Sequence, residues 1–288
     1  MTKEILLIGD FAGVGKVSFS VMTPILTAPG RTLNFLPTAV VSNSFDYGDA
    51  VVHELTSFMQ ETLEMWQKHQ FQFDLIVTGF IFSPVQVDII RNLIESQAQK
   101  PLLIADPIMG DLGELYAGLT PALITGVRQI LPLTDLIIPN LTEALLILGK
   151  EDQYGAVSEE KVFSWIKELI ALGAKSALIT SVEIKGNFYI FGYSEKEDCF
   201  FKVPYTMVPI HFGGTGDIFT SLITHKIIAE MSNTSHKDSA TSYTTLQAKV
   251  ERSAKTISEI LKIEAERSRD RIDEVYLQNH LEALRNIE

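Results

Sequence analysis

The chain has a single cysteine, Cys199, among its 288 residues. One cysteine cannot form a disulfide within the chain, which is typical of proteins in a reducing compartment. Long hydrophobic runs are missing as well, and the apolar segment at the N-terminus ends at Gly9-Asp10. That segment is too short for a signal peptide or a membrane span. We therefore expect a cytoplasmic protein without a membrane partner.

Basic residues are also scarce, with 24 Lys and Arg against 36 Asp and Glu and a formal net charge of -12. This balance argues against nucleic acid as a main partner. The six histidines show no close spacing of the kind that metal ligands have. The hydrophobic content of 46% and the charged content of 21% are those of an ordinary soluble globular protein.

No repeat, low-complexity tract or domain linker divides the sequence, so we expect one domain over residues 1–288. From about residue 231 to residue 288 we expect a loop followed by charged helix, without motifs. An apolar stripe of Ile257, Ile260, Leu261 and Ile263 marks one side of that helix.

Short aliphatic runs alternate with helical patterns along most of the chain. The runs cover residues 5–8, 75–78, 102–105, 136–138 and 176–180, and the helical patterns cover 52–69, 85–99, 121–131, 142–148 and 158–172. This alternation predicts a mostly parallel sheet with helices on both faces. Runs at 188–191 and 199–203 flank a polar turn and predict a β-hairpin. Ligands of such folds bind beyond the carboxyl ends of the strands.

A glycine-rich turn, Gly213-Gly214-Thr215-Gly216-Asp217, precedes an amphipathic helical pattern. Backbone N–H groups at a helix start lack intrahelical partners and attract anions, and glycine lets a phosphate approach closely. Asp217 would lie beside that phosphate, where a carboxylate can take a proton from an attacking hydroxyl. The turn indicates phosphoryl transfer. The alternative is a helix N-terminus that has Asp in its first turn for structural reasons alone.

Two carboxylates, Asp106 and Asp111, follow an expected strand in a loop that also contains Pro107 and Gly110. They suit a metal or substrate site, or they stabilise a turn. Thr180-Ser181 offers hydroxyls at the end of another strand, where contacts to phosphate are possible.

Asn140 and Glu143 open a helix with the spacing of a capping box. Capping alone explains them, and the alternative places both near magnesium and nucleotide phosphates. The segment Gly13-Val14-Gly15-Lys16 fails the Walker A spacing. It is either a tight turn or a place where Asp10 binds polar groups of a substrate.

Taken in order, these motifs resemble the ribokinase-like superfamily, and most closely its pyridoxal kinase branch. The similar segments are Thr38-Ala39-Val40-Val41-Ser42-Asn43 with Tyr47, Asp106-Pro107-Ile108-Met109-Gly110, Pro139-Asn140 with Glu143, and Gly214-Thr215-Gly216-Asp217. The resemblance extends from about Ile5 to Ile228. It implies a three-layer α/β/α fold with a mostly parallel central sheet and a small β-hairpin.

The resemblance further implies an ATP-dependent kinase that phosphorylates the 5′-hydroxymethyl group of pyridoxal, pyridoxine or pyridoxamine. ATP and Mg²⁺ would be required, activation by K⁺ stays open, and a homodimer is expected by analogy. Asp217 would be the general base, and the amides of Gly214, Thr215 and Gly216 would form the anion hole.

The same resemblance implies roles for the other candidates. Asp106, Asn140 and Glu143 would organise magnesium and phosphates, with Asp106 and Glu143 as metal ligands, while Thr180 and Ser181 would contact ATP. The acceptor-binding residues would be Asp10, Val40, Ser44, Phe80, Asp111, Tyr116 and Asp217.

Three departures from the family pattern concern the acceptor. Ser44-Phe45 stands where His-Thr is usual, Lys16 where Asn is usual, and Asp10 where many vitamin B6 kinases have Ser. Two alternatives therefore stay open. One is a hydroxymethylpyrimidine (phosphate) kinase of thiamin synthesis, and the other is a catalytically inactive relative that only binds a ligand.

Overall fold

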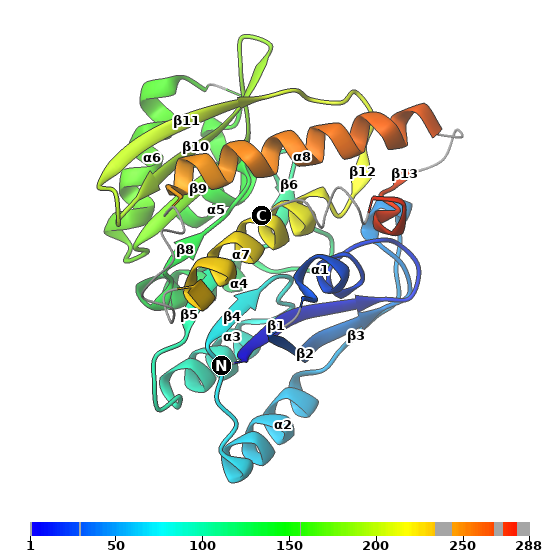
Figure 1. Ribbon diagram of the computed structural model, residues 1–288, viewed down its shortest axis with the longest axis vertical. Helices are drawn as coiled ribbons and strands as arrows, with labels where there is room; N and C mark the ends of the chain where they lie inside the picture. The colour runs from blue at the N-terminus through cyan, green and yellow to red at the C-terminus, as the bar shows by residue number, and fades with distance from the viewer. Residues whose placement is uncertain (1, 29, 156, 234–243, 268–272, 281–288) are drawn as a thin grey trace.

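The computed structural model describes residues 2–28, 30–155, 157–233, 244–267 and 273–280. Its main feature is a nine-stranded sheet in the order β11-β10-β9-β8-β5-β4-β1-β2-β3 (Figure 1). The strands are β1 Lys3–Ala12, β2 Arg31–Val41, β3 Val52–Glu54, β4 Leu75–Thr78, β5 Leu102–Ala105, β8 Leu136–Ile137, β9 Ser176–Ile184, β10 Asn187–Ser194 and β11 Cys199–Tyr205. The six strands from β9 to β2 are parallel, and β3, β10 and β11 are antiparallel to their neighbours.

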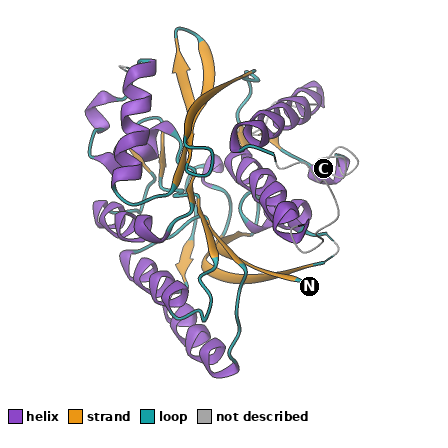
Figure 2. Ribbon diagram, turned by 60° about the vertical axis from the view of Figure 1, so that its left-hand side comes forward, coloured by secondary structure: helices purple, strands orange, loops and turns teal. Residues whose placement is uncertain are grey.

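Helices cover both faces of this sheet, as Figure 2 shows with the sheet seen nearly edge-on. One face carries α1 Phe19–Leu26, α7 Thr215–Asn233 and α8 Leu246–Arg267, and the other carries α2 Thr56–His69, α3 Pro84–Glu95, α4 Pro121–Ile130, α5 Leu141–Leu148 and α6 Glu159–Ala171. The expected three-layer α/β/α fold with a mostly parallel sheet and a hairpin, here β10 and β11, is confirmed.

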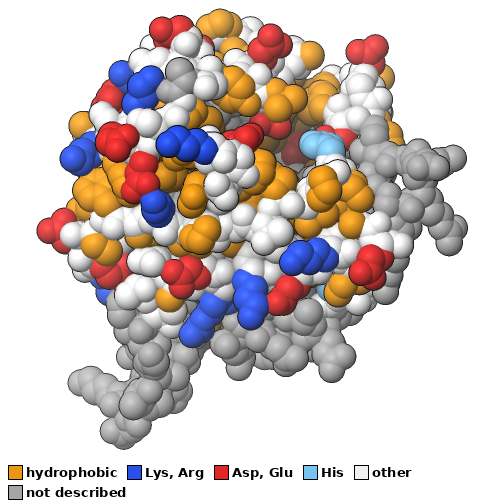
Figure 3. Space-filling view, turned by 90° about the horizontal axis from the view of Figure 1, so that it is seen from above, with side chains coloured by type: hydrophobic (Ala, Val, Ile, Leu, Met, Phe, Trp, Pro, Cys, Tyr) orange, Lys and Arg blue, Asp and Glu red, His pale blue; other side chains and the backbone are white. Residues whose placement is uncertain are grey.

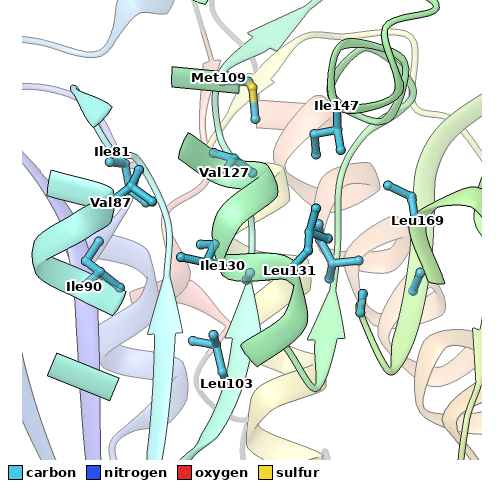
Figure 4. Packing of buried hydrophobic residues seen from close by; sticks show 14 of the residues in the cluster. Ile81, Val87, Ile90, Leu103, Met109, Val127, Ile130, Leu131, Ile147 and Leu169 are labelled. Carbon is cyan, nitrogen blue, oxygen red and sulfur yellow. The ribbon is translucent and has the colours of Figure 1, made fainter. Parts of the chain in front are cut away.

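Strand β1 shows why the sheet needs cover on both faces. Ile5 and Leu7 belong to the apolar cluster under α1, α7 and α8, whereas Leu6 and Ile8 belong to the cluster under the other helices. Successive side chains of a strand point to opposite faces, so a continuous aliphatic run buries both. Figure 4 shows part of the second cluster, where Val87 of α3 and Ile130 of α4 lie among its side chains above the strands.

One predicted helix begins later than expected, and the residues before it form a strand. Residues 52–69 do not form a single helix, because Val52–Glu54 pairs with the end of β2 and α2 begins only at Thr56. Strand β2 was not predicted, because Pro37 interrupts its hydrophobic pattern. The register between β1 and β2 shifts beside that proline, where Gly9 pairs with Pro37 and Asp10 with Ala39. Such a bulge redirects the side chains that follow it, and Asp10 is the first of them.

Short elements complete the described chain. They are β6 Gly110–Asp111, β7 Glu114–Leu115, β12 Phe212–Gly213, β13 Asp273–Glu274 and the 3₁₀ turns Phe45–Tyr47, Leu131–Leu133, Glu151–Gln153 and Leu277–Asn279. The loop expected from residue 231 differs in its first residues, because α7 continues to Asn233, and residues 234–243 lie outside the described residues. The described helices include none that is long and apolar enough to cross a membrane.

Candidate active site

A cavity of about 500 Å³ lies where the carboxyl ends of the parallel strands meet the start of α7. Of the candidate residues, it is lined by Asp10, Ser44, Phe80, Asp106, Asp111, Tyr116, Asn140, Glu143, Thr180, Ser181, Gly214, Thr215, Gly216 and Asp217. Val40 is not among the lining residues. Its side chain is 43% exposed, and the neighbouring Val41 lines the cavity instead. The strand alternation explains this difference, because Val40 and Val41 point to opposite faces.

The glycine-rich turn forms one end of the cavity. Strand β12 ends at Gly213, Gly214 has φ 75°, and α7 begins at Thr215. A Cβ atom at Gly214 would overlap the carbonyl oxygen of Lys16 in addition to straining the backbone. Glycine at this position therefore lets the chain enter the helix, whose first amides have no intrahelical partner, and Gly214, Thr215 and Gly216 line the cavity.

Asp217 lies in the first turn of α7 and is only 7% exposed. Its Oδ2 accepts a hydrogen bond of 2.8 Å from the backbone N–H of Ser18. Burial, followed by the negative charge of Asp106, raises the pKa of Asp217 to about 8. A carboxyl group with such a pKa is a stronger base than an exposed one once it has lost its proton.

Asp106 follows strand β5 and lies beside the same helix. The hydroxyl of Thr220 donates to its Oδ2 at 2.6 Å, and burial raises the pKa of Asp106 to about 7. Thr220 lies one helical turn after Asp217, so Asp106 lies close enough for its charge to raise the pKa of Asp217.

Asn140 and Glu143 form a complete capping box at the start of α5. Oδ1 of Asn140 accepts from the N–H of Glu143 at 2.9 Å, and Oε2 of Glu143 accepts from the N–H of Asn140 at 2.8 Å. Burial and the charge of Asp106 raise the pKa of Glu143 well above its ordinary value. Both residues also line the cavity, so capping and a position beside a ligand occur together.

Thr180 and Ser181 lie where β9 passes the cavity. The backbone N–H of Thr180 donates to the carbonyl of Pro139 at 2.9 Å, which holds β9 beside the start of α5. Ser181 has φ 58° in the middle of a strand. A residue other than glycine in that region is strained, and such strain concentrates at functional sites.

Aromatic rings form another part of the cavity wall. Phe45 stacks on Tyr116 with ring centroids 6.2 Å apart and lies 5.9 Å from the ring of Phe80. Asp10 and Asp111 add carboxylates to the lining of the cavity, and burial raises the pKa of Asp10. A flat apolar wall with a few polar groups fits a small aromatic ring that carries hydroxyls.

Two groups of lining residues were not predicted. Asp46 and His211 line the cavity with their side chains 2.8 Å apart, and no motif indicates a contact between such distant segments. An apolar region between β11 and α8 is formed by Met207, Val208, Ile210, Phe219, Ala254, Ile257 and Leu261. The apolar stripe on α8 was the only sign of that region in the sequence.

The charge on the cavity wall is strongly one-sided. Six carboxylates line it, namely Asp10, Asp46, Asp106, Asp111, Glu143 and Asp217, and no Lys or Arg stands among the described lining residues. Figure 3 shows acidic side chains beside a histidine and hydrophobic side chains on one face of the molecule. Within the part of the chain that the structure describes, no three His, Cys, Asp or Glu residues form a metal-binding group.

Comparisons with known proteins identify relatives of this chain. A family model described as phosphomethylpyrimidine kinase matches residues 36–260. A Bacteroides thetaiotaomicron protein described by that same activity, crystallised with pyridoxal, is 30% identical, with a TM-score of 0.87 over 99% of this chain and 96% of that chain. The pyridoxal kinase of Lactobacillus plantarum is 25% identical, with a TM-score of 0.84 over 99% of this chain and 97% of that chain. The pyridoxal kinase of Arabidopsis thaliana is 32% identical over 157 residues, which is 51% of this chain and 48% of that protein.

Proposed function

Since the chain belongs to the phosphomethylpyrimidine kinase family, within the ribokinase-like superfamily that also includes the pyridoxal kinases, we propose that it is a vitamin B6 kinase. It transfers the γ-phosphoryl group of ATP to the 5′-hydroxymethyl group of pyridoxal, pyridoxine or pyridoxamine. The observation that carries this proposal is that one cavity is lined both by the turn before Asp217 and by an aromatic wall.

In this reaction Asp217 takes the proton of the acceptor's hydroxyl as the oxygen attacks phosphorus. The amides of Gly214, Thr215 and Gly216 stabilise the negative charge that develops on the transferred group. Each such donor contributes a factor of about 10²–10³ to kcat. The dipole of α7 adds to this, because its positive end faces the same point.

Asp106 and Glu143 fit the role of residues that hold Mg²⁺. Both are buried carboxylates, and the charge of Asp106 raises the pKa of Glu143, which is a repulsion that a cation relieves. When bound, the ion neutralises charge on the phosphates of ATP. Asn140 positions Glu143 through the capping box. Replacing K⁺ by Na⁺ in the assay determines whether a monovalent cation contributes.

The remaining lining residues divide between the two substrates. Thr180 and Ser181 contact the phosphates of ATP, and the apolar region between β11 and α8 receives its base. Asp10, Ser44, Phe80, Asp111 and Tyr116 surround the ring of the acceptor.

The proposal includes a cytoplasmic homodimer. Phe11 and Val40 pair in the register of β1 and β2, and their side chains are 54% and 43% exposed. This apolar surface is available to a second copy of the chain. Light scattering tests the assembly, and a monomeric mass at micromolar concentration would reject the dimer.

A hydroxymethylpyrimidine (phosphate) kinase is the second candidate, because the description of the matching family model is phosphomethylpyrimidine kinase. Both acceptors are flat heteroaromatic alcohols, so the same base and the same turn would serve either. Side-by-side assays on the two alcohols separate them. A higher kcat/KM on the pyrimidine alcohol would show that it, and not a B6 vitamer, is the preferred acceptor.

The direct test measures ADP release with each B6 vitamer for the wild type and for Asp217→Asn. We expect turnover by the wild type and a loss of at least about 10²-fold in kcat for the variant, since only the base is removed. ATP binding should change little. No turnover on any vitamer would reject the proposal, and near-normal kcat in Asp217→Asn would reject the role of Asp217.

A further inference from the structure

Tyr47 belongs to a motif of the sequence, yet the proposed function gives it no role. Tyr47 is the last residue of the 3₁₀ turn Phe45–Tyr47. We call residues 42–48 the acceptor loop, because Ser44 and Phe45 within it line the cavity. The side chain of Tyr47 is not among the lining residues. Its hydroxyl donates a hydrogen bond of 2.7 Å to Oε1 of Glu274, close to the C-terminal end of the described chain.

Glu274 lies directly beside the catalytic turn. Strand β13 runs parallel to β12, with Gly213 paired to Glu274, and β12 leads into Gly214 and the first turn of α7 (Figure 1). Val275 and Leu277, which follow, are fully buried in a cluster formed with α1, α7 and α8. Residues 273–277 are therefore a fixed support for the turn, and we call them the C-terminal strap.

A second contact ties the acceptor loop to the same turn. Oδ1 of Asp46 lies 2.8 Å from Nε2 of His211, just before β12. The hydroxyl of Ser44 donates to the other oxygen of Asp46 at 2.6 Å, and a Cβ at Gly213 would overlap that oxygen. The loop thus contacts β12 through Asp46 and β13 through Tyr47.

The phenol of Tyr47 stays a hydrogen-bond donor at neutral pH. The hydrogen bond to Glu274, followed by partial burial, raises the pKa of Tyr47 to about 12, so the phenol keeps its proton. A hydroxyl that donates to a carboxylate makes a stronger hydrogen bond than one between neutral groups. Because Tyr47 is 43% exposed, losing this bond should alter the position of the loop more than the stability of the fold.

We infer that Tyr47 and Glu274 are positioning residues, whose hydrogen bond holds the acceptor loop against the catalytic turn so that the acceptor's hydroxyl stays within reach of Asp217. The inference rests on the proposed function for its kinetic consequences. Displacing a substrate by about 1 Å can lower the rate by up to about 10²-fold. Because the contact of Asp46 with His211 also holds the loop, we expect loss of the hydrogen bond between Tyr47 and Glu274 to cause only part of that decrease.

The test compares Tyr47→Phe, Glu274→Ala and their combination with the wild type. We expect each single change to lower kcat about five- to tenfold and to raise KM for the acceptor, with KM for ATP unchanged. The double variant should be no slower than the single ones, because both remove the same bond. Tyr193→Phe is the matched control. Its hydroxyl donates to Oδ1 of Asp198 at 2.9 Å on the β10–β11 hairpin, and neither residue lines the cavity.

Hydrogen exchange of the amides in residues 211–217 gives a readout that does not depend on turnover. Exchange should quicken in Tyr47→Phe and Glu274→Ala and stay unchanged in Tyr193→Phe. Absence of turnover in the wild type would reject the proposed function. The exchange data would still show whether the hydrogen bond between Tyr47 and Glu274 holds the acceptor loop against the catalytic turn. The inference is overturned if Tyr47→Phe behaves like Tyr193→Phe in both measurements, or if the effects of the two single changes multiply in the double variant.

Discussion

Asp217 combines two properties that oppose each other in a folded protein. It is nearly inaccessible to water, and its closest charged neighbours include Asp106 and Asp10, which are also acidic. Folding therefore disfavours its charge, and the proton that it retains must be lost before it can act as a base. We expect kcat/KM to rise with pH along an acid limb, whose midpoint a bound cation shifts downward.

The same carboxyl group makes the stability of the protein depend on pH. The folded-state pKa of Asp217 is about 8, against about 3.9 in an unfolded chain. Between these values the folded state binds more protons than the unfolded state, so the free energy of unfolding falls as pH rises. We expect Asp217→Asn to be about 1–3 kcal/mol more stable than the wild type at pH 9, with a smaller difference at pH 5. Urea denaturation without ligands at both pH values measures this.

Asp152→Asn is the control for that comparison, because Asp152 lies exposed in the turn Glu151–Gln153, away from the cavity. It should leave the free energy of unfolding within about 0.5 kcal/mol of the wild type at both pH values. An Asp217→Asn variant that is less stable than the wild type at pH 9 would contradict the expected direction.

At the scale of single elements, local patterns predict what local physics determines. The start of α7 and the capping box of α5 follow from glycine, Asn and Glu spacing, and both are present. Strand β2 could not be predicted, because Pro37 breaks its pattern and its bulge is set by pairing with β1. The pairing of β12 with β13 could not be predicted either, because two-residue strands have no periodicity and the two strands lie far apart in the sequence. The roles assigned to the cavity residues stay predictions.

Two glycines of the catalytic turn should respond differently to alanine. Gly214 has positive φ, and a Cβ there would overlap the carbonyl oxygen of Lys16, whereas a Cβ at Gly216 would meet open space. We expect Gly214→Ala to lose at least about 1–2 kcal/mol of stability and most turnover. Gly216→Ala should keep its stability, or gain up to about 1 kcal/mol, and still lose turnover because its methyl group obstructs the phosphate. Thermal unfolding and ADP release measure the two effects. Equal stability of the two variants would show that the turn is not constrained as described.

For the molecule as a whole, the main electrostatic feature is an acidic chain with an acidic cavity. The net charge of -12, to which the six acidic residues of the cavity wall contribute, disfavours the approach of an anion, and a kinase must nevertheless bind the polyanion ATP there. We expect bound cations to lower this negative potential and so to favour binding of the nucleotide.

Thermal unfolding in Mg²⁺ and in Na⁺ at equal ionic strength tests this requirement. We expect Mg²⁺ to raise Tm by about 2–4 °C at pH 8, which corresponds to about 1 kcal/mol for a chain of this size. Asp106→Asn should remove the additional stabilisation, because it removes a carboxylate proposed to hold the ion. If Mg²⁺ and Na⁺ give the same Tm in the wild type, these carboxylates do not form a divalent site in the absence of nucleotide.

Helix α8 and strand β13 lie near the end of the described chain, yet they complete the cavity that earlier segments begin. Ile257 and Leu261 supply part of its wall, and Glu274 contacts the acceptor loop. A nascent chain that has been synthesised only as far as α7 already contains Asp217 and the glycines but lacks that wall. The cavity is therefore complete only once α8 and β13 have docked on the segments that precede them.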